Sequence, residues 1–180
     1  VDLFVAKYSP SGSVLWATKV STLAYDEGRG IVVDAQGNVY VTGVVSGSVT
    51  IGSSQITHKG QTDIFIAKLN ASGNFVWAQS FGGTGNDTAN TIAFDTKGSI
   101  YIAGTFDGTT KFGTTTLIAQ NGDAFVAKFD SAGLLSWAKQ IKSSGYAETF
   151  GLAVDSQDYS YVTGTFASNA TLGSKNLTSK

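Results

Sequence analysis

The amino-acid sequence predicts an all-β fold, a β-propeller of four-stranded antiparallel blades, with three blades' worth of sequence in 180 residues. The first observation is a repeat, because Trp16, Trp77 and Trp137 stand 61 and 60 positions apart. The second is that each repeat contains four short segments rich in β-branched and aromatic residues, bounded by turn-forming residues. The third is that no segment shows sustained helical periodicity. Since one repeat cannot bury its own apolar face, the repeats are expected to stack on one another.

Other landmark residues share the spacing of the tryptophans. The sets are Phe4, Phe65 and Phe125; Asp34, Asp95 and Asp155; Tyr40, Tyr101 and Tyr161; and Gly43, Gly104 and Gly164. Residues that recur in every copy are expected to serve the architecture first, so most of these marks predict structure rather than chemistry.

The middle copy shows the four predicted strands of a blade, at residues 92–94, 99–106, 123–130 and 134–141. Asp95 and Gly98 predict a tight turn after the first strand, and residues 131–133 predict a hairpin turn before the fourth. The first strand is continuously apolar, so it is expected to line the central channel between neighbouring blades. Residues 107–122 are expected to form a longer polar connection between the second and third strands.

The sequence begins and ends within a predicted blade rather than at a boundary between blades. Residues 1–27 correspond to the second half of a blade, 28–88 and 89–148 to full blades, and 149–180 to the first half of another. Three blades are too few to close a ring, because propellers have about four to eight. Either further blades lie outside this sequence, or a second copy of the chain completes the ring as half of a six-bladed assembly. The first alternative is favoured, because methionine is absent and both ends fall within a blade.

Composition excludes several classes of function. Net charge is −1 and there is no Lys/Arg run, so no nucleic-acid partner is predicted. No apolar stretch approaches the roughly 20 residues of a membrane helix, so no membrane span is predicted. Cysteine is absent and His58 is the single histidine, which excludes disulfides, Cys-ligated zinc, Cys nucleophiles and multi-His metal sites. No cofactor, metal or catalytic residue is therefore predicted.

Five segments of the middle of the chain together resemble the bacterial seven-bladed β-propeller repeat family. They are residues 63–68, 75–78, 82–87, 93–104 and 112–113, which read Asp-x-Phe-x-Ala-Lys, Phe-x-Trp-Ala, a Gly-Gly loop, Ala-x-Asp ending in Tyr-x-x-Gly, and Phe-Gly. The resemblance implies a propeller fold, an extracellular or cell-surface setting in a bacterium, and no catalytic residue, because the motif is structural. Two loops depart from the pattern: Asp158-Tyr159 replaces Gly-Asn, and residues 21–23 lack the Gly-Gly pair.

Three repeated residue types have both a functional and a structural interpretation. Asp34, Asp95 and Asp155 are calcium-ligand candidates, but one carboxylate per loop favours acceptance of backbone N–H bonds within each turn. Lys7, Lys68 and Lys128 are interpreted as half-buried ion-pair partners of a neighbouring Asp. The three tryptophans could form a sugar-stacking platform, but their apolar neighbours favour packing between blades.

The loop between the fourth and first strands is the candidate ligand-binding rim, because its chemistry varies most between copies and rigid scaffolds often present functional loops. Its candidate residues are Tyr25, Asp26, Glu27, Asn86, Asp87, Tyr146 and Glu148. Acids, an amide and tyrosines near an axis would suit a cation or a sugar, and the alternative is an ordinary polar loop.

The predicted function is a non-catalytic structural, adhesive or binding module of a bacterial exported or cell-surface protein. Such a module would present a rigid disc for contact with a protein or a surface. The alternative is a carbohydrate-binding, lectin-like propeller in which repeated weak sites add avidity. A hydrolase or lyase is the weakest hypothesis, because it requires acids paired across the channel.

Overall fold

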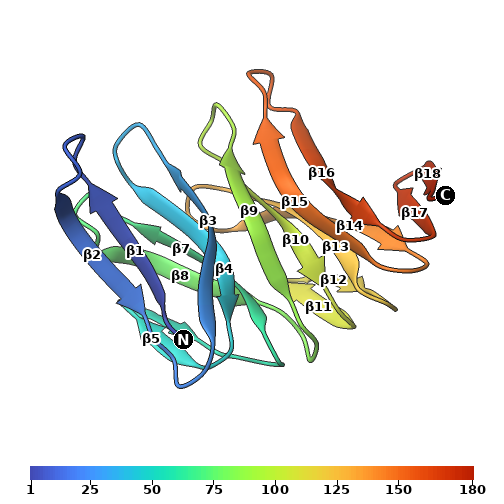
Figure 1. The fold of residues 1–180 in the computed structure, drawn as a ribbon, viewed down its shortest axis with the longest axis horizontal. Helices are drawn as coiled ribbons and strands as arrows, with labels where there is room; N and C mark the ends of the chain where they lie inside the picture. Colours follow the sequence, from blue (N-terminus) through green and yellow to red (C-terminus); the bar gives the residue numbers. More distant parts are fainter.

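The structure is a computed structural model that describes residues 1–180, and it consists of strands without any helix. Figure 1 shows an open arc of antiparallel sheets, with β3, β9 and β15 side by side in its middle. The N-terminal strands lie at one end of the arc, in blue, and the C-terminal strands at the other, in red (Figure 1). No helix that could cross a membrane is present.

Two complete blades form the centre of the arc. The first has the order β3 (Asp26–Val33), β4 (Val39–Val45), β7 (Asp63–Leu69) and β8 (Phe75–Phe81). The second has the order β9 (Thr88–Phe94), β10 (Ile100–Phe106), β13 (Asp123–Phe129) and β14 (Leu135–Ser143). These sheets confirm the predicted all-β fold of four-stranded antiparallel blades.

Each end of the arc carries one half of a blade. At the N-terminal end, β1 (Leu3–Tyr8) pairs with β2 (Val14–Val20) and occupies the position of a third and fourth strand. At the C-terminal end, β15 (Ala147–Val154) pairs with β16 (Ser160–Phe166) and occupies the position of a first and second strand. The chain therefore forms a partial propeller.

The connection between the second and third strands is a hairpin rather than the expected polar loop. Three such hairpins are present: β5 (Val49–Ile51) with β6 (Ser54–Ile56), β11 (Thr109–Phe112) with β12 (Thr115–Ile118), and β17 (Asn169–Leu172) with β18 (Lys175–Thr178). β17 pairs with β14 of the preceding blade, placing Leu172 opposite Ile141. Lys111 of β11 likewise bridges to Gly82, which follows β8. Two of the three hairpins, β11–β12 and β17–β18, thus pair with the end of the fourth strand of the preceding blade.

The apolar core lies between blades. Phe65 and Ile66 are adjacent in β7 and point to opposite faces of the sheet, as strand geometry requires. Phe65 joins Leu3 and Val5 of the preceding half-blade, whereas Ile66 joins a cluster that includes Phe125 of the following blade. Full burial of a side chain of this size stabilises the fold by about 1.5–3 kcal/mol relative to exposure, so each blade depends on the presence of its neighbours.

The sequence predicted that every first strand is buried on both faces. The structure confirms this for β9 but not for β3. β9 lies between β3 and β15, and its Ile92 is only 6% exposed. Ile31 occupies the equivalent position in β3 and is 56% exposed. The difference has a physical reason: the half-blade β1–β2 supplies no first strand to cover the outer side of β3.

Candidate functional site

Four polar side chains from three successive first strands are connected by hydrogen bonds and an ion pair. They are Glu27 and Arg29 of β3, Asn90 of β9 and Glu148 of β15, and we call them the inner polar network. Arg29 Nη1 donates a hydrogen bond to Asn90 Oδ1 at 2.7 Å. Asn90 Nδ2 donates to the carbonyl oxygen of Thr149 at 2.9 Å and approaches Glu148 Oε1 at 3.4 Å.

The N-terminal end of this network is an ion pair with a tyrosine attached. Arg29 Nη2 lies 2.9 Å from Glu27 Oε2, and Arg29 Nε donates to the same oxygen at 3.0 Å. Tyr25 Oη donates a third hydrogen bond to Glu27 Oε2 at 2.8 Å. The bond from Tyr25 and the Arg29 guanidinium lower the pKa of Glu27, and the same bond raises the pKa of the Tyr25 hydroxyl. Glu27 is therefore ionised at neutral pH.

A β-bulge in each first strand places these side chains. The pairing of β3 with β4 skips Arg29, which stands unpaired between Gly28 and Gly30. Asn90 occupies the same bulged position in β9, and Phe150 occupies it in β15. A bulge redirects the extra side chain away from the regular alternation of the strand, so the three bulges aim residues 29, 90 and 150 along the inner face.

The repeated glycine of the second strand makes room for each bulge. A Cβ on Gly104 would overlap the carbonyl oxygen of Thr88, and a Cβ on Gly43 would overlap that of Glu27. Gly164 stands in the same relation to Glu148. The invariant spacing of these glycines in the sequence is thus a signal of the bulge. It is also the signal that could have led to Arg29 and Asn90, which sequence reasoning missed.

Of the seven residues predicted for the rim, the structure brings Tyr25, Glu27 and Glu148 into or beside the inner polar network. Asp26 and Asp87 are instead fully buried beneath the loops. Asp26 accepts bonds from Thr22 N at 2.7 Å and Thr22 Oγ1 at 3.0 Å. Their physical role is to satisfy loop backbone groups rather than to face solvent.

The two remaining rim residues point elsewhere. Asn86 Nδ2 donates to Gln61 Oε1 at 3.0 Å, in the loop before β7. Tyr146 is exposed and makes no side-chain hydrogen bond. The candidate rim is therefore not one continuous site in the structure, and its connected part is the inner polar network.

A buried pair of carboxyl groups lies beneath the loop that contains Gly82. Asp87 accepts hydrogen bonds from Gly83 N at 2.8 Å and from Thr110 Oγ1. Asp63 accepts one from Lys59 N at 2.9 Å through Oδ2, while its Oδ1 has no hydrogen-bond partner. Burial raises the pKa of Asp87 to about 6, and the nearby charge of Asp63 acts in the same direction. No group of three or more acidic or histidine side chains is arranged to hold a metal ion.

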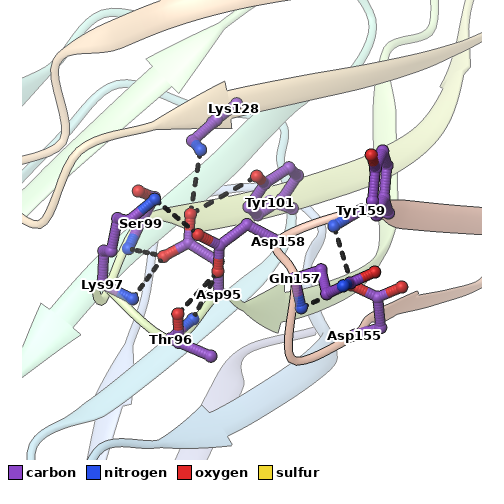
Figure 2. Close-up of polar contacts among 10 residues, drawn as sticks. All are labelled: Asp95, Thr96, Lys97, Ser99, Tyr101, Lys128, Asp155, Gln157, Asp158 and Tyr159. Carbon is purple, nitrogen blue, oxygen red and sulfur yellow. Dashed lines mark hydrogen bonds and ion pairs between the residues drawn. The ribbon is translucent and has the colours of Figure 1, made fainter.

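At the opposite ends of the same strands, the repeated aspartates organise the turns between first and second strands. Asp95 Oδ1 accepts hydrogen bonds from Lys97 N at 2.9 Å and Ser99 N at 2.8 Å (Figure 2). Asp34 and Asp155 make the equivalent bonds in their own turns. The prediction that these residues accept backbone N–H groups is confirmed.

The second oxygen of Asp95 forms an ion pair with a lysine, so the interaction predicted for all three repeated lysines is confirmed for Lys128 alone. Lys128 Nζ lies 2.9 Å from Asp95 Oδ2, and Tyr101 Oη donates to the same oxygen at 3.4 Å; Figure 2 shows both side chains directed at Asp95. Burial would raise the pKa of Asp95, but the bond from Lys128 and the backbone bonds outweigh it and lower the pKa. In the preceding blade, Lys68 Nζ instead lies 5.0 Å from the centroid of the Tyr40 ring, and Lys7 has no ion-pair partner.

The tryptophans pack between blades, as the sequence predicted. Trp16 Nε1 donates to the carbonyl oxygen of Ala71 at 3.0 Å, in the β7–β8 turn of the next blade. A Cβ on Gly73 of that turn would lie 2.6 Å from the Trp16 ring. Trp77 is in the same relation to Gly133 of the β13–β14 turn. Trp16 and Trp77 are therefore engaged in packing against the next blade.

The comparisons with known proteins agree with this architecture. A family model described as "Beta-propeller repeat" matches residues 15–44 and 76–108. These two segments of the chain are similar to β-propeller repeats. Each matched segment runs from the fourth strand of one blade through the second strand of the next, so it contains one bulge and one Asp-centred turn.

Two curated relatives match most of this chain. The uncharacterized WD repeat-containing protein L264 of Acanthamoeba polyphaga mimivirus is 27% identical over 92% of the chain. The regulatory protein FlaEY of Caulobacter vibrioides is 28% identical over 87% of the chain. The chain spans 14% and 17% of the lengths of these relatives, respectively.

Proposed function

We propose that this chain is a non-catalytic interaction module that uses the inner polar network to bind a protein partner. The observation that carries the proposal is the unbroken line of contacts from Glu27 through Arg29 and Asn90 to Glu148, which crosses three blades. Because all four residues stand on strands rather than on long loops, their side chains are held in a fixed arrangement. Fixed polar groups on a rigid scaffold are a common basis of specific recognition.

The charges of the network indicate what kind of partner segment would fit. Glu27 is neutralised by Arg29, whereas Glu148 is half-buried and has no ion pair. A carboxylate in this position accepts hydrogen bonds from a lysine or arginine side chain. A basic peptide segment is therefore the proposed ligand class. One relative is named a WD repeat-containing protein and the other a regulatory protein, which is consistent with an interaction role.

Catalysis is not part of this proposal. Glu27 is held ionised by Tyr25 and Arg29. Asp87, whose pKa is raised to about 6, is buried and bonded to loop groups. A general acid or base must reach its substrate within hydrogen-bond distance.

The setting that we propose is the cell surface or the exterior of a bacterium, as in the exported proteins whose repeats this sequence resembles. An adhesive role belongs to the same proposal, since a propeller disc offers a rigid face for contact. Fractionation of the source cells, with detection of this chain by a specific antibody, tests the setting. Recovery only in the cytoplasmic fraction would overturn it.

Selection of peptides tests the ligand class. A displayed peptide library is selected on the immobilised chain, and enriched peptides are measured against wild type and the Glu148→Gln variant. We expect enrichment in Lys and Arg, and about tenfold weaker binding to the variant, which corresponds to about 1.4 kcal/mol. Asp107→Asn is the matched control, because Asp107 is an exposed acid in the loop between β10 and β11. This variant should leave peptide binding unchanged. Enrichment of peptides without basic residues would refute the proposal. Equal binding of the peptides to wild type and to Glu148→Gln would also refute it.

Carbohydrate binding remains a second candidate, because Tyr25 and Tyr146 are exposed and each lies within two residues of a glutamate in the network. Exposed tyrosine rings beside carboxylates can stack on a sugar and accept its hydroxyl hydrogens. A glycan array probed with the chain separates the two candidates. Signal that is lost in Tyr25→Ala and Tyr146→Ala would favour the carbohydrate over the peptide.

A further inference from the structure

A polar hollow lies between the turns that join the first and second strands of the two complete blades. It has a volume of about 410 Å³, within the range of about 300–1,000 Å³ that ligand pockets occupy. One wall is formed by residues 33–36 at the end of β3, and the other by residues 94–98 at the end of β9. The inner polar network stands near the beginnings of the same strands, so the hollow is a separate place on the molecule.

The equivalent space between the next pair of turns is filled by a side chain of the protein itself. Asp158, in the β15–β16 turn, reaches back to the β9–β10 turn, where it accepts hydrogen bonds from Thr96 and pairs with Lys97 (Figure 2). Gly98 holds the position of Asp158 in the preceding turn, and its φ of 78° is close to the 67° of Asp158. A Cβ on Gly98 would meet nothing within 4 Å. The hollow is therefore the space that a side chain at residue 98 would occupy.

The turn that faces Gly98 has two hydrogen-bond donors without partners. Ala35 holds the position of Thr96, and its backbone N–H makes no hydrogen bond, whereas that of Thr96 donates to Asp158. Gln36 holds the position of Lys97. The side-chain amide of Gln36 also makes no hydrogen bond, because the bond from Gln36 to Asp34 comes from its backbone N–H. The contact that joins the next pair of turns thus lacks only its acceptor here.

The exchange of lysine for glutamine determines the charge of the group that would fit. Between the next pair of turns, the ammonium group of Lys97 neutralises the carboxylate of Asp158. Gln36 brings no charge, and Asp34 beside it is ionised: desolvation raises the pKa of Asp34, but hydrogen bonds within the turn outweigh it and lower the pKa. A ligand carboxylate would therefore be repelled by Asp34 without a free cation to offset it. A neutral hydroxyl group has no such cost, and it can both accept and donate hydrogen bonds.

We infer that this hollow binds a neutral sugar residue. One ring hydroxyl would take the place that a carboxylate holds between the next pair of turns, accepting hydrogen bonds from the Ala35 N–H and the Gln36 amide. A hydroxyl of the same sugar would donate to the carboxylate of Asp34. Phe94 lines the hollow as well, and it gives the carbon-bearing face of the ring an apolar surface on which to pack. This site does not depend on the protein-binding role proposed for the inner polar network.

Backbone amide resonances locate the ligand. The isotope-labelled chain is titrated with glucose, galactose, mannose and N-acetylglucosamine, and with glucuronate and acetamide as comparison probes. We expect at least one neutral sugar to shift the Ala35 and Gly98 resonances saturably and to bind more tightly than glucuronate.

Three results of this titration would overturn the proposal. The first is that no neutral sugar shifts the Ala35 resonance, or that glucuronate binds more tightly than all of them. The second is that shifts are confined to the surroundings of Tyr25 and Tyr146, which would place the sugar at the other ends of the strands. The third is that acetamide binds more tightly than every sugar, which would show that the hollow receives an amide side chain of a protein partner.

Filling the hollow tests it from the protein side. Gly98→Asn introduces a neutral acceptor at a position whose φ of 78° suits asparagine, so the new side chain should occupy the place of the sugar. We expect affinity for the sugar to fall about tenfold or more, and thermal unfolding verifies that the variant is folded. Gly113→Asn is the matched control, because Gly113 has a φ of 57° and a Cβ there also meets nothing within 4 Å, but it lies in the β11–β12 hairpin. Equal sugar binding by the two variants would refute the assignment.

A third variant removes a donor without altering the backbone. Gln36 is exposed, so Gln36→Leu should fold as the wild type does. Loss of one hydrogen bond should weaken sugar binding about threefold to tenfold. Unchanged affinity of Gln36→Leu would show that the amide does not hold the sugar, and the proposed arrangement would be wrong.

Discussion

Lys97 Nζ lies 2.6 Å from Asp158 Oδ2, in an ion pair that joins the β9–β10 turn to the β15–β16 turn of the next blade (Figure 2). Asp158 Oδ1 also accepts hydrogen bonds from Thr96 N at 3.1 Å and Thr96 Oγ1 at 2.7 Å. Asp158 has a φ of 67°, in the left-handed region, where Gly37 and Gly98 stand in the other two turns. The sequence departure at this position therefore keeps the turn geometry and adds a contact between blades.

Two replacements of Asp158 should separate the cost of its left-handed backbone conformation from the contribution of its contacts with Thr96 and Lys97. Asp158→Ala keeps a Cβ in the left-handed region and loses the bonds to Thr96 and Lys97, so we expect a measurable loss in the free energy of unfolding. Asp158→Gly loses the same bonds but relieves the backbone, so its net loss should be smaller by about 1 kcal/mol. Urea unfolding of both variants measures the difference. Equal stability of the two would mean that the backbone at 158 is unstrained.

Two glycines with the same backbone angle should respond differently to a methyl group. Gly12 and Gly73 have φ values of 84° and 83° in equivalent hairpin turns. A Cβ on Gly12 meets nothing within 4 Å, whereas one on Gly73 would lie 2.6 Å from the Trp16 ring.

We expect Gly12→Ala to cost about 1 kcal/mol, from backbone strain alone. Gly73→Ala should cost about 1–3 kcal/mol more, because the Trp16 ring must shift. Both variants are measured by thermal unfolding. If Gly73→Ala were no worse than Gly12→Ala, the packing of Trp16 on this turn would be wrong.

The free energy of unfolding should rise as pH falls from above 6 toward 4. The pKa of Asp87 in the folded protein is about 6, above its ordinary value of 3.8, so the folded state binds this proton more tightly than the unfolded state. Protonation between pH 6 and 4 therefore stabilises the fold, by an amount on the order of 1–3 kcal/mol. Asp87→Asn should remove this rise.

The turn aspartate has the opposite dependence. The pKa of Asp95 is lowered in the folded state, so its contribution is fully present above its ordinary value and is lost as pH falls below it. Urea unfolding from pH 3 to 8 should thus show greatest stability at mildly acidic pH. A curve for Asp87→Asn that parallels wild type between pH 6 and 4 would contradict the assignment to Asp87.

Gly104→Ala in β10 should displace Asn90 of the adjacent strand β9 and so weaken the inner polar network. Its Cβ would overlap the carbonyl oxygen of Thr88, so the bulge at Asn90 must move. We expect a loss of about 2–4 kcal/mol in the free energy of unfolding. Asn90→Ala, which leaves the backbone intact, should cost about 1 kcal/mol. Calorimetry compares the two variants, and similar small losses would show that the bulge tolerates a side chain at 104.

Local sequence signals were sufficient for the strands and the Asp-centred turns. Residues 99–106 and 123–130 carry β-branched and aromatic residues between turn-forming ones, and both contain strands in the structure. Asp95 was assigned to its turn because its spacing to Gly98 is a turn pattern, and its bonds to Lys97 and Ser99 follow from that. These features depend on neighbours within a few residues.

The features that escaped prediction depend on contacts between repeats. Arg29 and Asn90 are 61 positions apart, and only the stacking of two bulges brings them to 2.7 Å. The alternation of buried Asp26 with half-exposed Glu27 depends on the register of β3 against β4, which one sequence does not reveal. The sequence predicts a polar loop for the hairpin of β11 and β12, because these strands are short and rich in threonine. The hairpin is also bridged to Gly82, which follows β8 of the preceding blade, and the sequence does not reveal that contact.

The repeated register has a consequence for how such a chain changes in length over evolution. Glycine stands opposite phenylalanine in both complete blades, and the same two residue types stand at the free edges. A duplication or deletion of one whole period therefore leaves every junction matched, whatever residue it starts from. Such a change should therefore be tolerated without compensating substitutions at the junction.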